Sequence, residues 1–129
     1  MGLMEQSYTV VIADDIFTNR LLLSEIIEDL GHKYIAVENG KQAIEALEKN
    51  NVDLVLMDIE MPVMNGLEAT IYIREKLSPP KSTIPVIALT ANVMRGDREK
   101  SLEAGCDGYI EKPIDIDLLP EQIQRFLRS

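Results

Sequence analysis

The sequence predicts a doubly wound α/β fold, in which helices cover both faces of a parallel β-sheet. Short β-branched and aliphatic runs alternate with longer segments of helical periodicity along the chain, which is typical of βαβ units. The runs VVIA, LVLM and VIAL also lack polar residues at alternate positions, so both faces of these strands are expected to be buried. A parallel sheet between two layers of helices meets that expectation.

Five short runs rich in aliphatic and β-branched residues are expected to form the strands. In chain order they are YTVVIA, YIAVE, VDLVLM, IPVIALT and GYI, at residues 8–13, 34–38, 52–57, 84–90 and 108–110. A polar or turn-forming residue closes or follows each run, which limits the strands to ordinary lengths.

Each predicted strand is followed by a segment whose apolar residues have helical spacing. In order, these segments are 16–30, 41–50, 67–77, a stretch that contains Gly96 and ends at Ala104, and 117–128. Gly31 and Gly105 follow the first and fourth segments, and glycine commonly ends helices. Pro120 fits only the first turn of the last helix, because proline has no backbone N–H to donate.

Length and composition indicate a single domain. The 129 residues are enough for one sizeable core and too few for two, and the 46% apolar and 27% charged contents are ordinary for a globular protein. We therefore expect one domain over residues 1–129, with its core at about 8–127, and no output domain. No segment approaches the ~20 apolar residues that cross a membrane. Residues 1–7 are polar and carry Glu5, so no signal peptide is expected and a cytoplasmic location is predicted.

Charge and cysteine content exclude several classes of function. A net charge of −9 and a pI near 4.5 argue against direct nucleic-acid binding, which needs a basic face, and no membrane partner is expected. Cys106 is the only cysteine and His32 the only histidine, so neither a disulfide nor a zinc site is expected. Cys106 is interpreted as a small buried residue near a helix end, and His32 as a loop side chain.

Chemically useful side chains gather at the C-terminal ends of the predicted strands. Asp14 and Asp15 follow the first strand, Asp58 follows the third, Thr90 closes the fourth and Lys112 follows the fifth. In doubly wound sheets, ligands bind outside the carboxyl ends of the strands, near the point where the strand order reverses. Three carboxylates, a hydroxyl and an ammonium group are therefore expected to converge.

This group of side chains predicts a divalent metal. Two carboxylates about 4 Å apart repel by ~4 kcal/mol at an effective dielectric constant of ~20, so three together need a cation to stay ionised. Mg²⁺ prefers oxygen ligands and is typically held by one or two carboxylates with a phosphate. Mn²⁺ shares that preference and is the alternative ion, whereas the His and Cys ligands of Zn²⁺ are absent.

With a metal bound, Asp58 is expected to act as a nucleophile. A carboxylate can attack phosphorus to form an aspartyl phosphate, provided that the oxygens of the transferring group are neutralised. The Lys112 ammonium and the Thr90 hydroxyl are suited to that role. An acyl phosphate is prone to hydrolysis, so the same site would set the lifetime of the modification.

The motifs IADD, LMDIEMPVMNG, IPVIALTAN and GYIEKPI stand in this order at the predicted strand ends. With them the chain resembles receiver domains of the two-component response regulator family, from Tyr8 to about Leu127. The stretch ANVMRGDREKSLEAGCDGYIEKPI is most similar to single-domain regulators of the cell-polarity type and to receivers of hybrid histidine kinases. The resemblance implies a flavodoxin-like sheet with strand order 2-1-3-4-5.

The resemblance also implies a role for each site residue. Asp58 would be the phosphoacceptor, Thr90 the switch hydroxyl and Lys112 the cation that binds the phosphoryl group. The implied Mg²⁺ ligands are Asp15, Asp14 (largely through water), Asp58 and the backbone carbonyl of Glu60. The chain would thus be a signalling phosphoacceptor that assists its own phosphorylation and dephosphorylation, and not an enzyme acting on separate substrates.

A conformational switch is expected to follow phosphorylation. The phosphoryl group adds acceptor oxygens beside Thr90, which can draw its hydroxyl inward and vacate space behind the fourth strand. Tyr109 occupies the position of the family's aromatic switch, and we predict that it turns into that space. Gly96, expected inside the fourth helix, would make that segment malleable. A downstream protein partner would then bind the surface of helix 4, strand 5 and helix 5.

The phosphodonor is expected to contact the first helix. Leu21, Leu22 and Leu23 are consecutive, and neighbours lie ~100° apart on a helix, so one of them should be partly exposed. The resemblance implies that this helix docks against a histidine kinase or a histidine phosphotransfer protein. Glu60 and Asn92 lie where the family tunes dephosphorylation, and the direction of their effect stays open.

Three other functions fit the residues less well. A flavodoxin-like cofactor module would share the fold, but Asp14 and Asp15 would repel a flavin phosphate. A phosphatase of the haloacid dehalogenase type would share Mg²⁺, Asp, Thr and Lys, but the stretch DIE lacks the second aspartate of its DxD motif. A degenerate receiver that binds partners without phosphorylation would lack part of the acceptor set, which is present here.

Overall fold

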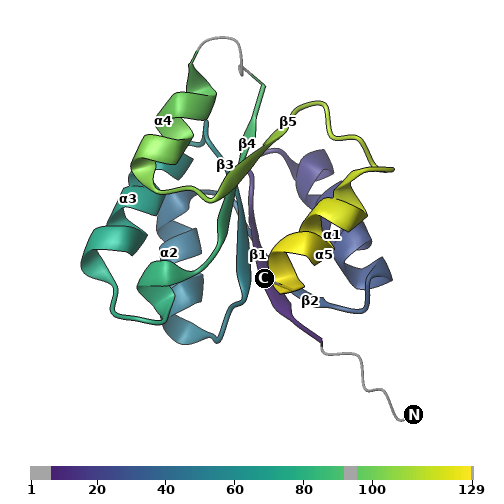
Figure 1. The fold of residues 1–129 in the computed structure, drawn as a ribbon, viewed down its shortest axis with the longest axis horizontal. Coiled ribbons are helices and arrows are strands. Elements are labelled where there is room, and N and C mark those ends of the chain that lie inside the picture. Colours follow the sequence, from purple (N-terminus) through teal and green to yellow (C-terminus); the bar gives the residue numbers. More distant parts are fainter. Residues whose placement is uncertain (1–6, 92–95, 129) are drawn as a thin grey trace.

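The protein forms a five-stranded parallel sheet with helices on both faces (Figure 1). A computed structural model describes residues 7–91 and 96–128. The strands are β1 (Thr9–Ala13), β2 (Lys33–Val37), β3 (Leu54–Asp58), β4 (Val86–Thr90) and β5 (Gly108–Glu111). They lie in the order β2-β1-β3-β4-β5 and every neighbouring pair is parallel, which confirms the predicted fold class and strand order.

The helices match the predicted segments to within a few residues. They are α1 (Phe17–Asp29), α2 (Gly40–Lys49), α3 (Gly66–Lys76), α4 (Asp97–Ala104) and α5 (Leu119–Arg128), with a 3-10 turn at Lys81–Thr83. The Asn39 side chain caps α2, and Asn65 forms a reciprocal capping box with Glu68 at the start of α3. These caps satisfy backbone N–H groups that the first turn of a helix leaves unpaired.

The sheet separates two hydrophobic clusters. Helices α1 and α5 pack on one face, and α2 and α3 pack on the other, with α4 beside α3 (Figure 1). Along β1, Val10 and Ile12 belong to the first cluster, and Val11 and Ala13 belong to the second. All four are fully buried, which confirms that this strand has no solvent-facing side.

The expectation that Gly96 lies inside the fourth helix is wrong. Gly96 precedes α4 as its N-cap residue, with a φ of 83° in the left-handed region. That conformation cannot continue an α-helix, and glycine adopts it without the steric cost that other residues incur. Gly96 therefore defines where α4 begins.

His32 is buried, although it was interpreted as a loop side chain. It lies between α1 and β2, as expected, but its Nδ1 accepts a hydrogen bond from the backbone N–H of Tyr8 at 3.1 Å. Its Nε2 lies 2.7 Å from Oε1 of Gln124 on α5. The ring therefore links the start of the sheet to the last helix. Cys106, in contrast, is buried just after α4, as predicted.

Gly66 allows the start of α3 to pack directly on the end of β3. A Cβ atom at this position would lie 2.2 Å from the carbonyl oxygen of Asp58 and 2.9 Å from Cγ of Met57. The backbone N–H of Gly66 also donates to the carbonyl of Ile59 at 2.9 Å. This contact fixes the backbone on either side of the Asp58 carboxylate. Among the described residues, no helix has the length and apolar character needed to span a bilayer.

Candidate functional site

The predicted site residues meet in a cleft at the carboxyl edge of the sheet. The cleft has a volume of about 640 Å³, and its lining includes Asp15, Asp58, Thr90, Asp97 and Lys112. Asp58 and Thr90 end β3 and β4, Asp15 and Lys112 follow β1 and β5, and Asp97 begins α4. They meet because parallel strands place their carboxyl ends at the same edge of the sheet. Asp14 lies beneath the cleft and is fully buried.

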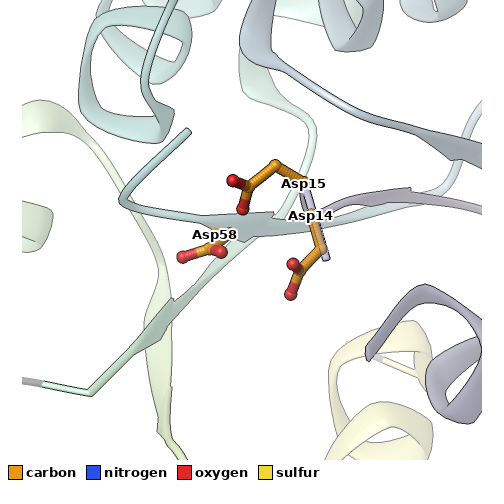
Figure 2. Close-up of side chains that lie close together, drawn as sticks. All are labelled: Asp14, Asp15 and Asp58. Carbon is orange, nitrogen blue, oxygen red and sulfur yellow. The ribbon is translucent and has the colours of Figure 1, made fainter. Parts of the chain in front are cut away.

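Three carboxylates form the acidic part of the site (Figure 2). One carboxylate oxygen from each of Asp14, Asp15 and Asp58 lies within 4.8 Å of the others. Asp15 is exposed at the mouth of the cleft, whereas Asp58 keeps only 5% of its surface accessible. Figure 2 shows the Asp14 and Asp15 side chains leaving the end of β1 in opposite directions. The cluster therefore has a buried side and a side open to solvent.

Asp58 is held in place by two hydrogen bonds. Its Oδ1 accepts from the backbone N–H of Glu60 at 3.2 Å, and its Oδ2 accepts from Nζ of Lys112 at 2.9 Å. The first bond spans two residues and is the kind of local bond that a turn aspartate makes. Asp58 thus forms part of the turn and also faces the ammonium group.

Only one of the two carboxylate oxygens of Asp14 accepts a hydrogen bond from the described residues. Its Oδ1 accepts from the backbone N–H of Ile16 at 2.9 Å, just before α1. Its Oδ2 is buried and accepts no hydrogen bond within the described part of the chain, and it forms an ion pair with the Lys112 ammonium at 3.4 Å. An unsatisfied buried carboxylate oxygen is costly, so this atom is suited to a further cation or to water.

The charge balance of the site is visible in two pKa shifts. Burial raises the pKa of Asp58 from 3.8 to about 6, against the opposing effect of the Lys112 hydrogen bond and charge. Burial on its own would lower the pKa of Lys112, but hydrogen bonding and attraction to Asp58, with the charge of Asp14, outweigh it and raise that pKa. One ammonium group is therefore insufficient to compensate the buried carboxylates.

The oxygen ligands at this site fit a hard divalent cation. The three aspartates supply only oxygen ligands, they are close enough to share one ion, and Asp14 has an oxygen without a hydrogen bond. The Glu60 side chain is exposed and its residue lines the cleft next to Asp58. The arrangement is therefore suited to Mg²⁺ and to an anionic group that the ion and Lys112 could bind together.

Thr90 and Tyr109 are both in contact with the start of α4. The Thr90 hydroxyl is buried and donates to Oδ2 of Asp97 at 3.1 Å. Tyr109 on β5 packs partly buried against the cluster beneath α2 and α3, and the guanidinium carbon of Arg98 lies 5.2 Å from its ring centroid. Asp97 and Arg98 were not identified from the sequence. An acidic residue in a first helical turn is already explained by the helix dipole, so its position gave no separate signal.

The structure thus brings five of the predicted residues together: Asp14, Asp15, Asp58, Thr90 and Lys112. Glu60 lies at the rim of the cleft, and Tyr109 lies on the neighbouring strand. Asn92 lies outside the described residues.

An apolar surface lies beside the cleft at the start of α1. Ile16, Phe17 and Leu21 are 50%, 65% and 47% exposed. Leu23 is fully buried whereas Leu21 is exposed, which confirms that one of the three consecutive leucines faces away from the core. Ile16 also lines the cleft, so this surface is continuous with the site.

Comparison with known families and proteins adds independent information. Residues 10–124 match the family described as the response regulator receiver domain. The chain is 37% identical over 119 residues to the polar-differentiation response regulator DivK of Brucella anthropi, covering 92% of this chain and 95% of DivK. It is 40% identical over 119 residues to hybrid signal transduction histidine kinase I of Dictyostelium discoideum, covering 88% of this chain but 7% of that kinase.

Solved structures with a similar fold include the receiver domain of a sensor histidine kinase and the receiver domain of a response regulator. The receiver domain of sensor histidine kinase PA1611 from Pseudomonas aeruginosa, with magnesium coordinated in its active site cleft, has a TM-score of 0.87 and 33% identity, covering 96% of this chain and all of that one. The receiver of Ssk1 in complex with the histidine phosphotransfer protein Ypd1, from Saccharomyces cerevisiae, has a TM-score of 0.83 and 26% identity, covering 93% and 88% of the two chains.

Proposed function

This chain belongs to the response regulator receiver domain family, and on that premise we propose that Asp58 accepts a phosphoryl group from a phosphohistidine donor. The observation that carries the proposal is the arrangement around Asp58. Its Oδ2 lies 2.9 Å from the Lys112 ammonium, and carboxylate oxygens of Asp14 and Asp15 lie within 4.8 Å. A cleft with these charges is suited to bind an anionic phosphoryl group together with a divalent cation.

The transfer forms one bond and breaks one bond. A lone pair of an Asp58 carboxylate oxygen attacks phosphorus to form an O–P bond, while the N–P bond of the phosphohistidine breaks and its electron pair stays on the imidazole. The product is an acyl phosphate on Asp58 and a free histidine on the donor. Attack by water on the same phosphorus later releases inorganic phosphate and restores the carboxylate.

Lys112 and Thr90 stabilise the transferring group. The Lys112 ammonium already reaches the attacking carboxylate, so it is placed to neutralise a phosphoryl oxygen without a large movement. Thr90 lines the same cleft and can donate its hydroxyl proton to another phosphoryl oxygen. Neither residue forms a covalent bond in the reaction.

Asp14, Asp15, Asp58 and the backbone carbonyl of Glu60 would hold Mg²⁺ at this site, and Mn²⁺ is the alternative ion. A bound divalent cation would neutralise the carboxylates and the incoming phosphoryl oxygens. Support comes from Oδ2 of Asp14, which is buried and accepts no hydrogen bond from the described residues, and from the magnesium in the PA1611 receiver. The role of the Glu60 carbonyl rests on family resemblance.

On phosphorylation of Asp58, the Thr90 side chain is proposed to move toward the phosphoryl group. The Tyr109 ring would then turn into the space that Thr90 leaves behind β4. The surface of α4, β5 and α5 would then bind a downstream protein partner. A cytoplasmic location stays a prediction, as does the absence of direct nucleic-acid and membrane binding.

The apolar surface formed by Ile16, Phe17 and Leu21 is the proposed docking site of the donor. It adjoins the cleft, so a donor histidine bound against α1 could reach Asp58. A receiver of similar fold is known in complex with a histidine phosphotransfer protein, which supports a donor of that class here. A histidine kinase is the other candidate donor.

Phosphotransfer from a protein donor tests the proposal. A histidine phosphotransfer domain phosphorylated on its histidine is mixed with the chain and Mg²⁺, and intact masses are recorded over time. The wild type should gain one phosphoryl group, and Asp58→Asn should gain none. Asp29→Asn, which removes an exposed carboxylate at the end of α1, is the matched control and should behave as the wild type. Equal transfer to Asp58→Asn would refute the assignment of the acceptor.

A further inference from the structure

The first turn of α4 contacts both predicted switch residues at once. Asp97, the first residue of α4, accepts the Thr90 hydroxyl hydrogen bond at 3.1 Å, and the next residue, Arg98, places its guanidinium carbon 5.2 Å from the Tyr109 ring centroid. Thr90 ends β4, Tyr109 lies on β5, and these strands are neighbours (Figure 1). Two consecutive residues of one helix therefore hold side chains from two strands.

We propose that Asp97 is a positioning residue that opposes phosphorylation by competing with the phosphoryl group for the Thr90 hydroxyl. The inference rests on the proposed function and concerns the regulation of the same site. Asp97 would hold the unphosphorylated arrangement, and its release would free the first turn of α4. Arg98 would hold Tyr109 in the same arrangement, so one helical turn links the two movements.

The competition follows from the chemistry of a hydroxyl group. The Thr90 hydroxyl has one proton to donate, and in this structure it donates it to the Asp97 carboxylate. A hydrogen bond to a charged acceptor is stronger than one to a neutral acceptor, so that proton is not released freely. Binding of a phosphoryl oxygen by Thr90 therefore requires that the bond to Asp97 be given up.

Charge adds to the competition. Asp97 lines the cleft that also contains Asp58, Asp15 and Lys112. A phosphoryl group on Asp58 would bring further negative charge into this cleft, and like charges in a partly buried site repel. The Asp97 carboxylate would thus lose a hydrogen bond and gain a repulsive neighbour in the same step. Both effects favour its movement away from Thr90.

The local backbone leaves Asp97 available for this role. The N-cap residue is Gly96, which has no side chain, and no side-chain cap bond is formed at this end of α4. Asp97 and Glu99 are both acidic residues of the first turn, and both interact favourably with the helix dipole. Only Asp97 of the two reaches Thr90 and lines the cleft. Glu99 is exposed and is therefore the matched control.

The affinity for beryllofluoride, a phosphoryl analogue, tests the inference. It is measured by titration calorimetry with Mg²⁺ present, for the wild type, Asp97→Asn, Asp97→Ala and Glu99→Gln. Neutralising Asp97 should tighten binding by about threefold to tenfold, because a charge-assisted competing hydrogen bond is weakened or removed. Glu99→Gln should bind as the wild type. A residue that only stabilised α4 would not give tighter binding when it is replaced.

A second comparison isolates the hydroxyl. In a Thr90→Val background, Asp97→Asn should tighten binding by clearly less than it does with Thr90 present, since only the charge repulsion is then relieved and no hydroxyl is contested. An equal gain in Glu99→Gln, or a gain of the same size without the hydroxyl, would overturn the inference, as would unchanged affinity in both Asp97 variants. The proposed function fails on a different result, namely wild-type binding that is absent or does not depend on Asp58.

Discussion

At the scale of single residues, the site combines deep burial with too little positive charge. Asp14 and Asp58 are buried, Asp15 lies beside them, and Lys112 is the cation that contacts the two buried carboxylates. Such a group costs stability in the absence of a further cation. This cost is located at the proposed phosphorylation site, and functional sites commonly contain groups with such perturbed ionisation.

The raised pKa of Asp58 makes the stability of the metal-free protein depend on pH. Because the folded-state pKa is about 6 and the ordinary value is 3.8, the folded state binds this proton more tightly. Proton binding by Asp58 therefore stabilises the folded state. This contribution to the free energy of unfolding is complete below about pH 3.8 and is lost as the pH rises through about 6. At pH 7.5 with a chelator, Asp58→Asn should therefore be about 1–3 kcal/mol more stable than the wild type.

Urea unfolding at pH 4.5 and pH 7.5 measures this difference. The gain from Asp58→Asn should shrink at the lower pH, and it should also shrink at pH 7.5 when Mg²⁺ is added. Asp29→Asn removes an exposed carboxylate and controls for net charge. If Asp58→Asn and the wild type lose stability in parallel between the two pH values, the burial cost assigned to Asp58 is wrong.

The sequence identified the side chains of the site better than the contacts between them. Asp58, Thr90 and Lys112 could be predicted, because a parallel sheet brings the ends of its strands together whatever the loop details. The hydrogen bond between Thr90 and Asp97 could not be predicted, because it depends on where Gly96 ends the loop and α4 begins. The burial of His32 likewise depends on Gln124, 92 positions away along the chain.

At the scale of secondary-structure elements, the site depends on close packing between β3 and α3. Gly66 starts α3 against the backbone of Asp58, and no side chain fits between them. In the sequence, Gly66 stands just before the helix predicted over residues 67–77. The sequence did not reveal this close approach, which depends on how the first residue of α3 packs against the end of β3.

Gly66→Ala should disturb this junction. The added Cβ would lie 2.2 Å from the carbonyl oxygen of Asp58, so the backbone must shift, and the expected loss of stability is about 1–3 kcal/mol. Gly108→Ala is the control, because the atom nearest to its Cβ is the far end of the Phe126 ring, which can move aside. Urea unfolding of both variants measures the loss of stability, and calorimetry measures their Mg²⁺ binding. Weaker Mg²⁺ binding is expected in Gly66→Ala alone, and unchanged stability and binding in that variant would contradict it.

The exposed part of α1 should matter for a protein donor and not for a small one. Leu21→Asp should slow transfer from a phosphorylated histidine phosphotransfer domain by about tenfold or more, because a charge replaces an apolar contact at an interface. Uptake from acetyl phosphate should be unchanged.

Ile71→Asp on α3 is the matched control, since Ile71 is 42% exposed and Leu21 is 47% exposed. Rates of mass gain with each donor give the comparison. An equal loss with both donors in Leu21→Asp, or an equal loss of protein-donor transfer in Ile71→Asp, would remove the case for docking at α1.

At the scale of the whole molecule, the sheet places the acceptor between two surfaces. Helices α1 and α4 lie on opposite sides of the sheet (Figure 1), and residues at the start of each, Ile16 and Asp97, line the cleft. The donor would bind at the first surface, and the state of Asp58 would be sensed at the second. Membership of the receiver family accounts for this arrangement, so neither a flavin-binding module nor a haloacid dehalogenase-type phosphatase is needed to explain it.

The fold of the whole molecule was predictable because its three central strands, β1, β3 and β4, are buried on both faces. Runs such as VVIA and LVLM have no polar alternation, and each strand is followed by one amphipathic or buried helix. The order β2-β1-β3-β4-β5 came from family resemblance, and hydrophobic pattern alone did not determine it.

The central claim is that Asp58 carries the phosphoryl group, and mass analysis of the acetyl phosphate reaction tests it most directly. The wild type and Asp58→Asn are incubated with acetyl phosphate, with Mg²⁺ or with a chelator, and the modified peptide is located after borohydride reduction of the acyl phosphate. We expect one phosphoryl group, about 80 Da, on Asp58 of the wild type with Mg²⁺ and none in the other samples. An adduct on another residue, or one that persists in Asp58→Asn, would contradict the claim.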